Sequence, residues 1–185
     1  LEVGSGTGAT IAHVLSSLKT LSAQVEYCYR DISLRFIQHG EQVFGHDYPF
    51  ASFQLFDMEQ APEQQGFERN SYDLIIGTNC VHATRDITAT LNRLKRLLRT
   101  NGLFIVNEFT ERLDYNTLTF GWTSGWWLFE DVSWRIKHSP LLSRTQWQQL
   151  LESNGFKTPQ FLGITDDPKT CLLYTSPSPR DSIAS

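Results

Sequence analysis

The amino-acid sequence predicts an α/β fold, a Rossmann-like doubly wound sheet of mostly parallel strands. Short apolar runs alternate along the chain with segments of helical periodicity, which is typical of such folds. A glycine-rich turn over residues 4–8 follows a strand that ends at Val3 and precedes a helix. Residues 72–77 form a nearly continuous apolar run, as expected for a central parallel strand buried on both faces.

The N-terminal half is predicted to alternate between helix and strand. Residues 9–19 form a helix because their apolar residues recur on one face, and residues 25–31 form a strand rich in β-forming side chains. Ser33 is the predicted N-cap of the next helix. Residues 50–56 alternate as a third strand, and a polar loop over 62–70 follows.

The alternation continues after the central strand. Residues 86–99 form a helix with an apolar stripe and a solvated cationic outer face, which Asn101 and Gly102 end. A fifth strand follows over 103–106 and ends near Glu108.

The last third of the chain carries weaker signals. Ser143 and Gln146 form a capping box that begins one more helix. Two last strands are predicted over 161–164 and 170–174. Residues 175–185 show no packing pattern, so we expect a disordered or non-native tail there.

Composition limits the classes of protein to consider. The 185 residues allow one domain, and a net charge of −4 argues against general nucleic-acid binding and against an anionic membrane surface. No apolar run approaches the roughly 18 residues that a membrane span needs. Three widely separated cysteines argue against a disulfide framework or a metal site and favour a cytoplasmic protein. Because Met58 is the only methionine and the chain opens inside a strand, we expect a fragment truncated at its N-terminus.

The glycine turn predicts a ligand site. Glycines between a strand and a helix let the backbone approach a ligand and direct helix N–H groups at it. The spacing also satisfies a relaxed dinucleotide fingerprint, with Asp31 as the acid that binds ribose. Glu2 lies just before the turn, where it would meet a positively charged ligand end and repel a pyrophosphate. Asp57, at the end of the third strand, faces the ligand crevice or is a solvated loop acid.

These acids and glycines resemble the class I S-adenosylmethionine-dependent methyltransferases, from residue 1 to about residue 164. The resemblance implies a seven-stranded sheet with S-adenosylmethionine across the carboxyl ends of its first strands. It implies that the glycine turn passes under the amino-acid part of the cofactor, that Asp31 holds the ribose and that Asp57 and Met58 meet the adenine. The expected cofactor site comprises Glu2, Gly4, Ser5, Gly6, Gly8, Asp31, Ile32, Asp57, Met58 and Asn79.

His82 and Glu108 are the candidate catalytic residues. Each lies at the end of one of two neighbouring predicted strands, so both belong in the same crevice. Imidazole, with an unperturbed pKa of about 6.5, suits proton abstraction at cellular pH, and a carboxylate on its other nitrogen fixes the tautomer. We interpret the other histidines as surface residues.

Four separated blocks resemble the C-methyltransferase domains of modular polyketide synthases, in which a His and a Glu at the matching places form a catalytic dyad. The blocks are residues 79–86, 107–110, 125–129 and 140–143. All five tryptophans lie between Trp122 and Trp147. We expect Trp126 and Trp127 to face an acyl substrate and most of the others to pack in the core.

The resemblance implies a methyltransferase domain over residues 1–174. Its expected reaction is S-adenosylmethionine-dependent C-methylation of the α-carbon of a β-ketoacyl thioester during polyketide biosynthesis. The implied partners are an acyl carrier protein and neighbouring synthase domains. Three alternatives stay open: O- or N-methylation of a small natural product, a nicotinamide-dependent dehydrogenase, and an inactive structural domain of a synthase.

Overall fold

The computed structural model describes residues 1–157, 159–163 and 172–177. The strands of this part form one seven-stranded sheet in the order β3-β2-β1-β4-β5-β7-β6. Strands β1 to β5 pair in parallel, whereas β7 is antiparallel to both β5 and β6. The strands are β1 (Glu2–Val3), β2 (Tyr27–Asp31), β3 (Ala51–Leu55), β4 (Tyr72–Thr78), β5 (Leu98–Glu108), β6 (Gln160–Gly163) and β7 (Leu172–Pro177).

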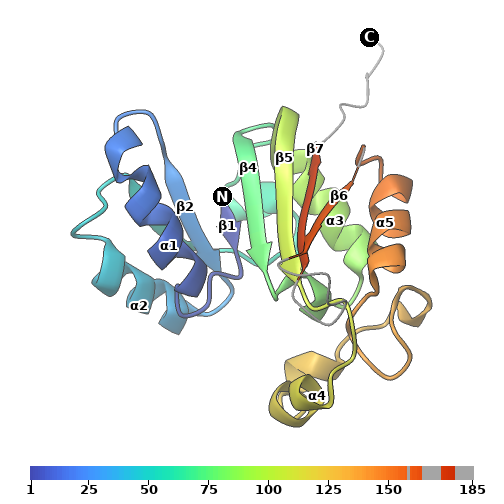
Figure 1. The fold of residues 1–185 in the computed structure, drawn as a ribbon. Coiled ribbons are helices and arrows are strands. Elements are labelled where there is room, and N and C mark those ends of the chain that lie inside the picture. Colours follow the sequence, from blue (N-terminus) through green and yellow to red (C-terminus); the bar gives the residue numbers. More distant parts are fainter. Residues whose placement is uncertain (158, 164–171, 178–185) are drawn as a thin grey trace.

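Five α-helices and several short 3₁₀ helices connect the strands of the described chain. The α-helices are α1 (Ala9–Leu18), α2 (Leu34–Phe44), α3 (Ile87–Leu97), α4 (Asp114–Phe120) and α5 (Arg144–Ser153). The 3₁₀ helices are η1 (Lys19–Leu21), η2 (Pro62–Gln65), η3 (Val81–Ala83), η4 (Ser124–Trp127) and η5 (Val132–Trp134). Figure 1 shows α4 beyond the carboxyl ends of β4 and β5, apart from the helices that flank the sheet.

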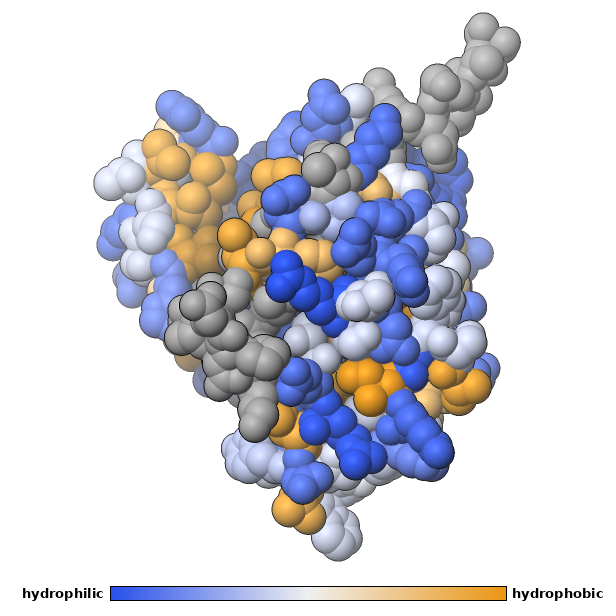
Figure 2. Space-filling model, turned by 45° about the vertical axis from the view of Figure 1, so that its right-hand side comes forward, coloured by the Kyte–Doolittle hydropathy of each residue, from blue (hydrophilic) through white to orange (hydrophobic). Residues whose placement is uncertain are grey.

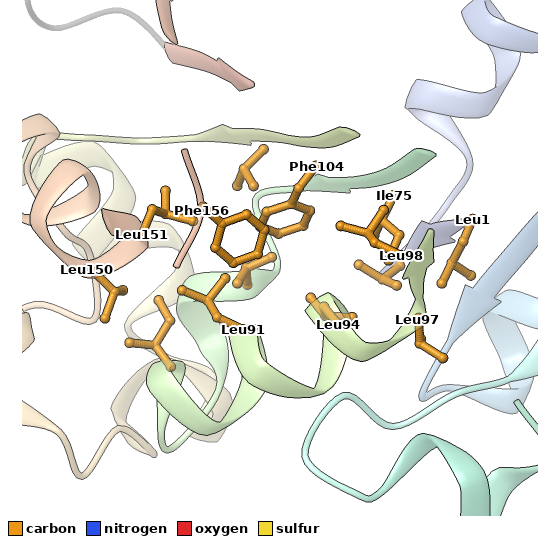
Figure 3. Packing of buried hydrophobic residues seen from close by; sticks show 14 of the residues in the cluster. Leu1, Ile75, Leu91, Leu94, Leu97, Leu98, Phe104, Leu150, Leu151 and Phe156 are labelled. Atoms are coloured by element: carbon orange, nitrogen blue, oxygen red, sulfur yellow. The ribbon is translucent and has the colours of Figure 1, made fainter. Parts of the chain in front are cut away.

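Two hydrophobic clusters cover opposite faces of the sheet. In β2, Tyr27 and Tyr29 belong to the cluster with α1 and α2, whereas Cys28 between them packs against the other cluster. Neighbouring residues of a strand point to opposite faces, so the helices lie on both sides and the predicted doubly wound fold is confirmed. Figure 3 shows part of the larger cluster, in which Phe104 of β5 lies beside Phe156, and Leu91 of α3 lies below these two rings.

Strand β4 is less covered than predicted. Ile75 is fully buried against the larger cluster, but Leu74 and Ile76 are only half-buried. On the second face, α2 packs on β2 and β3, and Thr10 of α1 hydrogen-bonds to Thr78 at the end of β4. The prediction of a strand buried on both faces was therefore wrong for one face.

The surface of the molecule is mostly hydrophilic on the face that Figure 2 shows, as expected where amphipathic helices cover a core. The face in Figure 2, which brings the α5 side of the molecule forward, shows separate hydrophobic patches among hydrophilic residues. In the described part of the chain, no helix has the length and apolarity that crossing a membrane requires.

Several element ends differ from the predictions. The capping box of Ser143 and Gln146 is present, and α5 follows it. Strand β5 begins earlier than predicted, at Leu98, directly after α3. Residues 175–177, expected to belong to a tail, instead pair with β5 as the end of β7, and the remainder of that tail lies outside the described residues.

Candidate active site

The glycine turn after β1 requires glycine for two separate reasons. Gly4, Gly6 and Gly8 have φ angles of 60°, 57° and 85°, a region that other L-residues rarely adopt. A Cβ on Gly4 would lie only 2.4 Å from the Cβ of Cys80, so Gly4 is also needed for packing. A Cβ on Gly6 would meet nothing closer than the Gly4 carbonyl oxygen at 3.9 Å. The turn is therefore closely packed at Gly4 and open at Gly6.

Asp31 at the end of β2 is joined to the glycine turn. Its Oδ2 accepts a hydrogen bond of 2.9 Å from the Gly6 N–H, and its Oδ1 accepts one of 2.8 Å from the Ser33 N–H. The adjacent Ile32 is 68% exposed, which leaves an apolar side chain uncovered beside the turn. Ser33 is the N-cap of α2 as predicted, but its side chain makes no capping hydrogen bond. The structure thus brings Asp31, Ile32 and the turn together.

Glu2 lies deep in the sheet and has a protein partner. It is 1% exposed, and the Tyr27 hydroxyl donates to its Oε2 over 2.8 Å. Burial raises the pKa of the Glu2 carboxyl from its ordinary 4.5 to about 7, although the Tyr27 hydrogen bond opposes the shift. The carboxyl is therefore neutral in the folded protein over a pH range in which the unfolded chain ionises.

We expect Glu2→Gln to remove one source of pH-dependent instability. The folded carboxyl has the higher pKa, so its stabilising contribution is complete below pH 4.5 and is lost as pH rises through about 7. A shift of this size corresponds to about 3 kcal/mol. Between pH 4 and pH 8, the free energy of unfolding of the wild type should fall by that amount relative to Glu2→Gln, as measured by urea denaturation. A difference in the free energy of unfolding that stays constant between pH 4 and pH 8 would contradict the pKa of about 7 for the Glu2 carboxyl.

Most of the remaining predicted cofactor residues make hydrogen bonds or packing contacts with other residues of the chain. Asp57 lies two residues beyond β3 rather than at its end, and its Oδ1 accepts from the Glu59 N–H. Met58 packs against the larger core. The hydroxyl of the buried Ser5 donates to the Arg30 carbonyl over 3.0 Å. The predicted set is completed by Asn79, which is exposed with a φ of 48°.

His82 and Glu108 form a buried pair at the carboxyl ends of β4 and β5. His82 lies in η3, and its Nδ1 contacts Oε2 of Glu108, the last residue of β5. Glu108 Oε1 accepts hydrogen bonds from the N–H groups of Cys80 at 3.1 Å and Val81 at 2.9 Å. The two side chains are 5% and 2% exposed. One carboxylate therefore fixes both the imidazole ring and the loop that carries it, and the predicted proximity is confirmed.

The Trp126 side chain packs against the His82 imidazole of this pair. Its ring meets the His82 imidazole edge-on at 5.7 Å and stacks on Phe120 of α4 at 5.8 Å. Trp127 is 48% exposed, and its Nε1 donates to the Gly121 carbonyl over 2.8 Å. Trp147 lies in the larger core and Trp134 packs against it, whereas Trp122 is 87% exposed. Core packing therefore holds for most of the other tryptophans, as predicted.

Sequence reasoning missed Arg135. This residue follows η5, is 5% exposed and forms an ion pair with Asp131. The spacing of four residues between an acid and a base was the only available signal, and it normally indicates a surface helix pair.

The fold and the site define the class of protein. A parallel sheet in the order β3-β2-β1-β4-β5, extended by an antiparallel hairpin, carries a glycine turn after β1 and an acid after β2. These are the features that class I methyltransferases share. The chain belongs to the methyltransferase domain family, whose model matches residues 1–104.

Individual proteins that are similar to this chain include polyketide synthases and methyltransferases of known structure. The polyketide synthase PksR of Bacillus subtilis is 40% identical over 163 residues, which cover 88% of this chain and 6% of that protein. The crystal structure of the DszA carbon methyltransferase superimposes with a TM-score of 0.91 at 41% identity, covering 96% of this chain and 46% of that one. The trans-methyltransferase CalH in complex with SAH superimposes with a TM-score of 0.86 at 26% identity, covering 96% of this chain and 50% of that one. The chain thus spans half or less of each of these proteins.

Proposed function

We propose that this chain is the C-methyltransferase domain of a cytoplasmic polyketide synthase. It transfers a methyl group from S-adenosylmethionine to the α-carbon of a β-ketoacyl thioester carried by an acyl carrier protein. The observation that carries the proposal is the buried His82–Glu108 pair at the carboxyl ends of β4 and β5, where β4 is the strand that pairs with β1 before the glycine turn. The similarity to a polyketide synthase and to a carbon methyltransferase supports the choice of carbon as the acceptor.

The pair suits a carbon acid of moderate strength. An α-carbon between two carbonyl groups loses its proton readily enough for an imidazole base. A carboxylate only accepts hydrogen bonds, so Nδ1 of His82 carries the proton that faces Glu108 and Nε2 is the basic nitrogen. The hydrogen bonds that His82 makes to other described residues use its Nδ1 and its backbone N–H and carbonyl groups. His82 therefore takes the α-proton on Nε2, while Glu108 stabilises the resulting imidazolium.

The residues around the turn fit the proposed cofactor. Gly6 leaves room that a side chain would fill, Asp31 supplies a carboxylate beside it, and the exposed Ile32 offers an apolar surface to an adenine ring. When bound, S-adenosylmethionine supplies a sulfonium methyl group that a carbanionic α-carbon can attack. The protein contributes by holding the substrate and the base in position and by keeping Asp31 fixed through two backbone N–H groups.

Gly6→Ala should weaken cofactor binding more than it weakens the fold. The added methyl group enters the open space at the turn, and we expect an affinity for S-adenosylhomocysteine at least about tenfold lower by calorimetry. Gly66→Ala is the matched control, because Gly66 also has a positive φ, of 84°, and a Cβ added there would have nothing within 4 Å. Both variants should lose similar thermal stability. Equal affinities in the two variants would refute the assignment of this turn.

The identity of the methyl acceptor is tested by comparing two thioester substrates. The protein should methylate a β-ketoacyl pantetheine thioester and leave the saturated acyl analogue unchanged, because only in the first does the α-carbon lie between two carbonyl groups, which makes it a much stronger carbon acid. Mass spectrometry measures the gain of one methylene unit. Methylation of an amine or hydroxyl substrate in place of the β-ketoacyl thioester would favour the alternative of an O- or N-methyltransferase, and no transfer at all would favour an inactive structural domain.

A further inference from the structure

Arg135 binds three backbone carbonyl groups from two separate segments of the chain. Its Nη1 donates to the carbonyls of His82 and Pro140, each over 2.7 Å, and its Nη2 donates to the carbonyl of Thr84 over 2.9 Å. Two of these carbonyls belong to the loop that carries the imidazole. The guanidinium is thus attached to the backbone of the proposed base itself.

Asp131 neutralises Arg135 and extends the network. Its carboxylate accepts from Nε of Arg135 over 2.6 Å and from Nη2 over 3.0 Å. It also accepts from the N–H of Ile87, the first residue of α3, over 2.8 Å. In addition, the N–H of Glu130 donates to the Arg85 carbonyl over 2.9 Å. Segment 130–135 therefore holds residues 82–87 along their whole length.

We propose that Arg135 is a positioning residue for the His82 base, an inference that rests on the proposed function. The imidazole is fixed from two sides: Glu108 holds its Nδ1 and the N–H groups before it, and Arg135 holds the carbonyls of His82 and Thr84. A displacement of about 1 Å at a reacting group can cost about 100-fold in rate. Arg135 acts through the loop, without touching the reacting atoms.

Only a planar guanidinium has the number and arrangement of N–H donors that these acceptors around Arg135 require. Arginine has five N–H donors in a fixed fork, and Arg135 directs them at three carbonyls and one carboxylate simultaneously. An ammonium group has three donors at one point and cannot reach all of these acceptors. Arg135→Lys therefore keeps the charge opposite Asp131 but loosens the loop.

The first test compares Arg135→Lys with Arg30→Lys. Arg30 is the matched control, because it is equally buried at 5% and donates to backbone carbonyls of Tyr29 and Ser52, on β2 and β3. We expect Arg135→Lys to lower kcat about 10- to 100-fold while KM for S-adenosylmethionine changes less than about threefold. Arg30→Lys should lower the melting temperature similarly and keep the wild-type kcat. If Arg135→Lys does not fold, Asp131→Asn provides the same test with a smaller loss of kcat.

A double-mutant cycle separates positioning from general stability. If Arg135 acts through His82, Arg135→Lys should cost less than about threefold in a His82→Ala background, because there is no base left to position. The full loss of kcat in that background, or a wild-type kcat for Arg135→Lys, would overturn the inference. A wild-type protein without methyl transfer to the β-ketoacyl thioester would overturn the proposed function, and this inference with it.

Discussion

His82→Ala should abolish nearly all methyl transfer while the protein still binds its cofactor. Removing a general base costs about 100- to 10,000-fold in rate, and the alanine variant has no other group at this position to accept the proton. The imidazole lies between Glu108 and Trp126, whereas the glycine turn follows β1 and Asp31 ends β2. We therefore expect kcat to fall by that factor and the affinity for S-adenosylhomocysteine to stay within about threefold.

The control for this variant is His13→Ala. His13 is an exposed residue of α1, and its replacement should leave both kcat and cofactor affinity unchanged. A His82→Ala protein with near wild-type turnover would show that another group removes the proton. A protein that had lost cofactor affinity would instead assign His82 to binding.

Glu108→Gln should reduce turnover by at least about 100-fold, although it only replaces one carboxylate oxygen by an NH₂ group. The amide oxygen can still accept from the N–H groups of Cys80 and Val81, so the loop keeps its anchor. The amide NH₂ then faces Nδ1 of His82 and donates to it. That reverses the tautomer, places the proton on Nε2 and removes the basic lone pair from the nitrogen that needs it.

Glu108→Ala distinguishes the two roles of this carboxylate, which are to orient the His82 imidazole and to accept hydrogen bonds from the loop backbone. It leaves two buried N–H groups without their acceptor, each costing about 1–3 kcal/mol, so its melting temperature should fall well below that of Glu108→Gln. Thermal denaturation and steady-state kinetics on the same preparations provide both values. A Glu108→Gln variant with wild-type kcat would contradict the tautomer argument and would favour an acceptor, such as an amine, that needs little base assistance.

Features that depend only on residues close together in the chain could be predicted from the sequence. The turn at Gly6 and the cap at Ser143 depend on neighbouring residues, and both were predicted correctly. The meeting of His82 with Glu108 needed one further rule, that parallel neighbouring strands bring their carboxyl ends to the same edge.

The features that sequence reasoning missed depend on long-range packing. Helix α4 has seven residues and no clear apolar period, so nothing in the sequence separates it from a loop. Residues 175–177 look like part of a polar tail but acquire a strand structure by pairing with β5. Arg135 is surrounded by carbonyl groups that only the folded chain assembles, and no spacing rule predicts acceptors of that kind.

The most direct test of the account is the position of a transferred methyl group. The wild-type protein is incubated with ¹³C-methyl S-adenosylmethionine and a β-ketoacyl pantetheine thioester, and the product is examined by NMR. We expect a labelled methyl group bonded to the α-carbon, formed by the wild type and by His13→Ala but not by His82→Ala. A label on oxygen or nitrogen, or an α-methyl product that forms equally well without His82, would contradict this expectation.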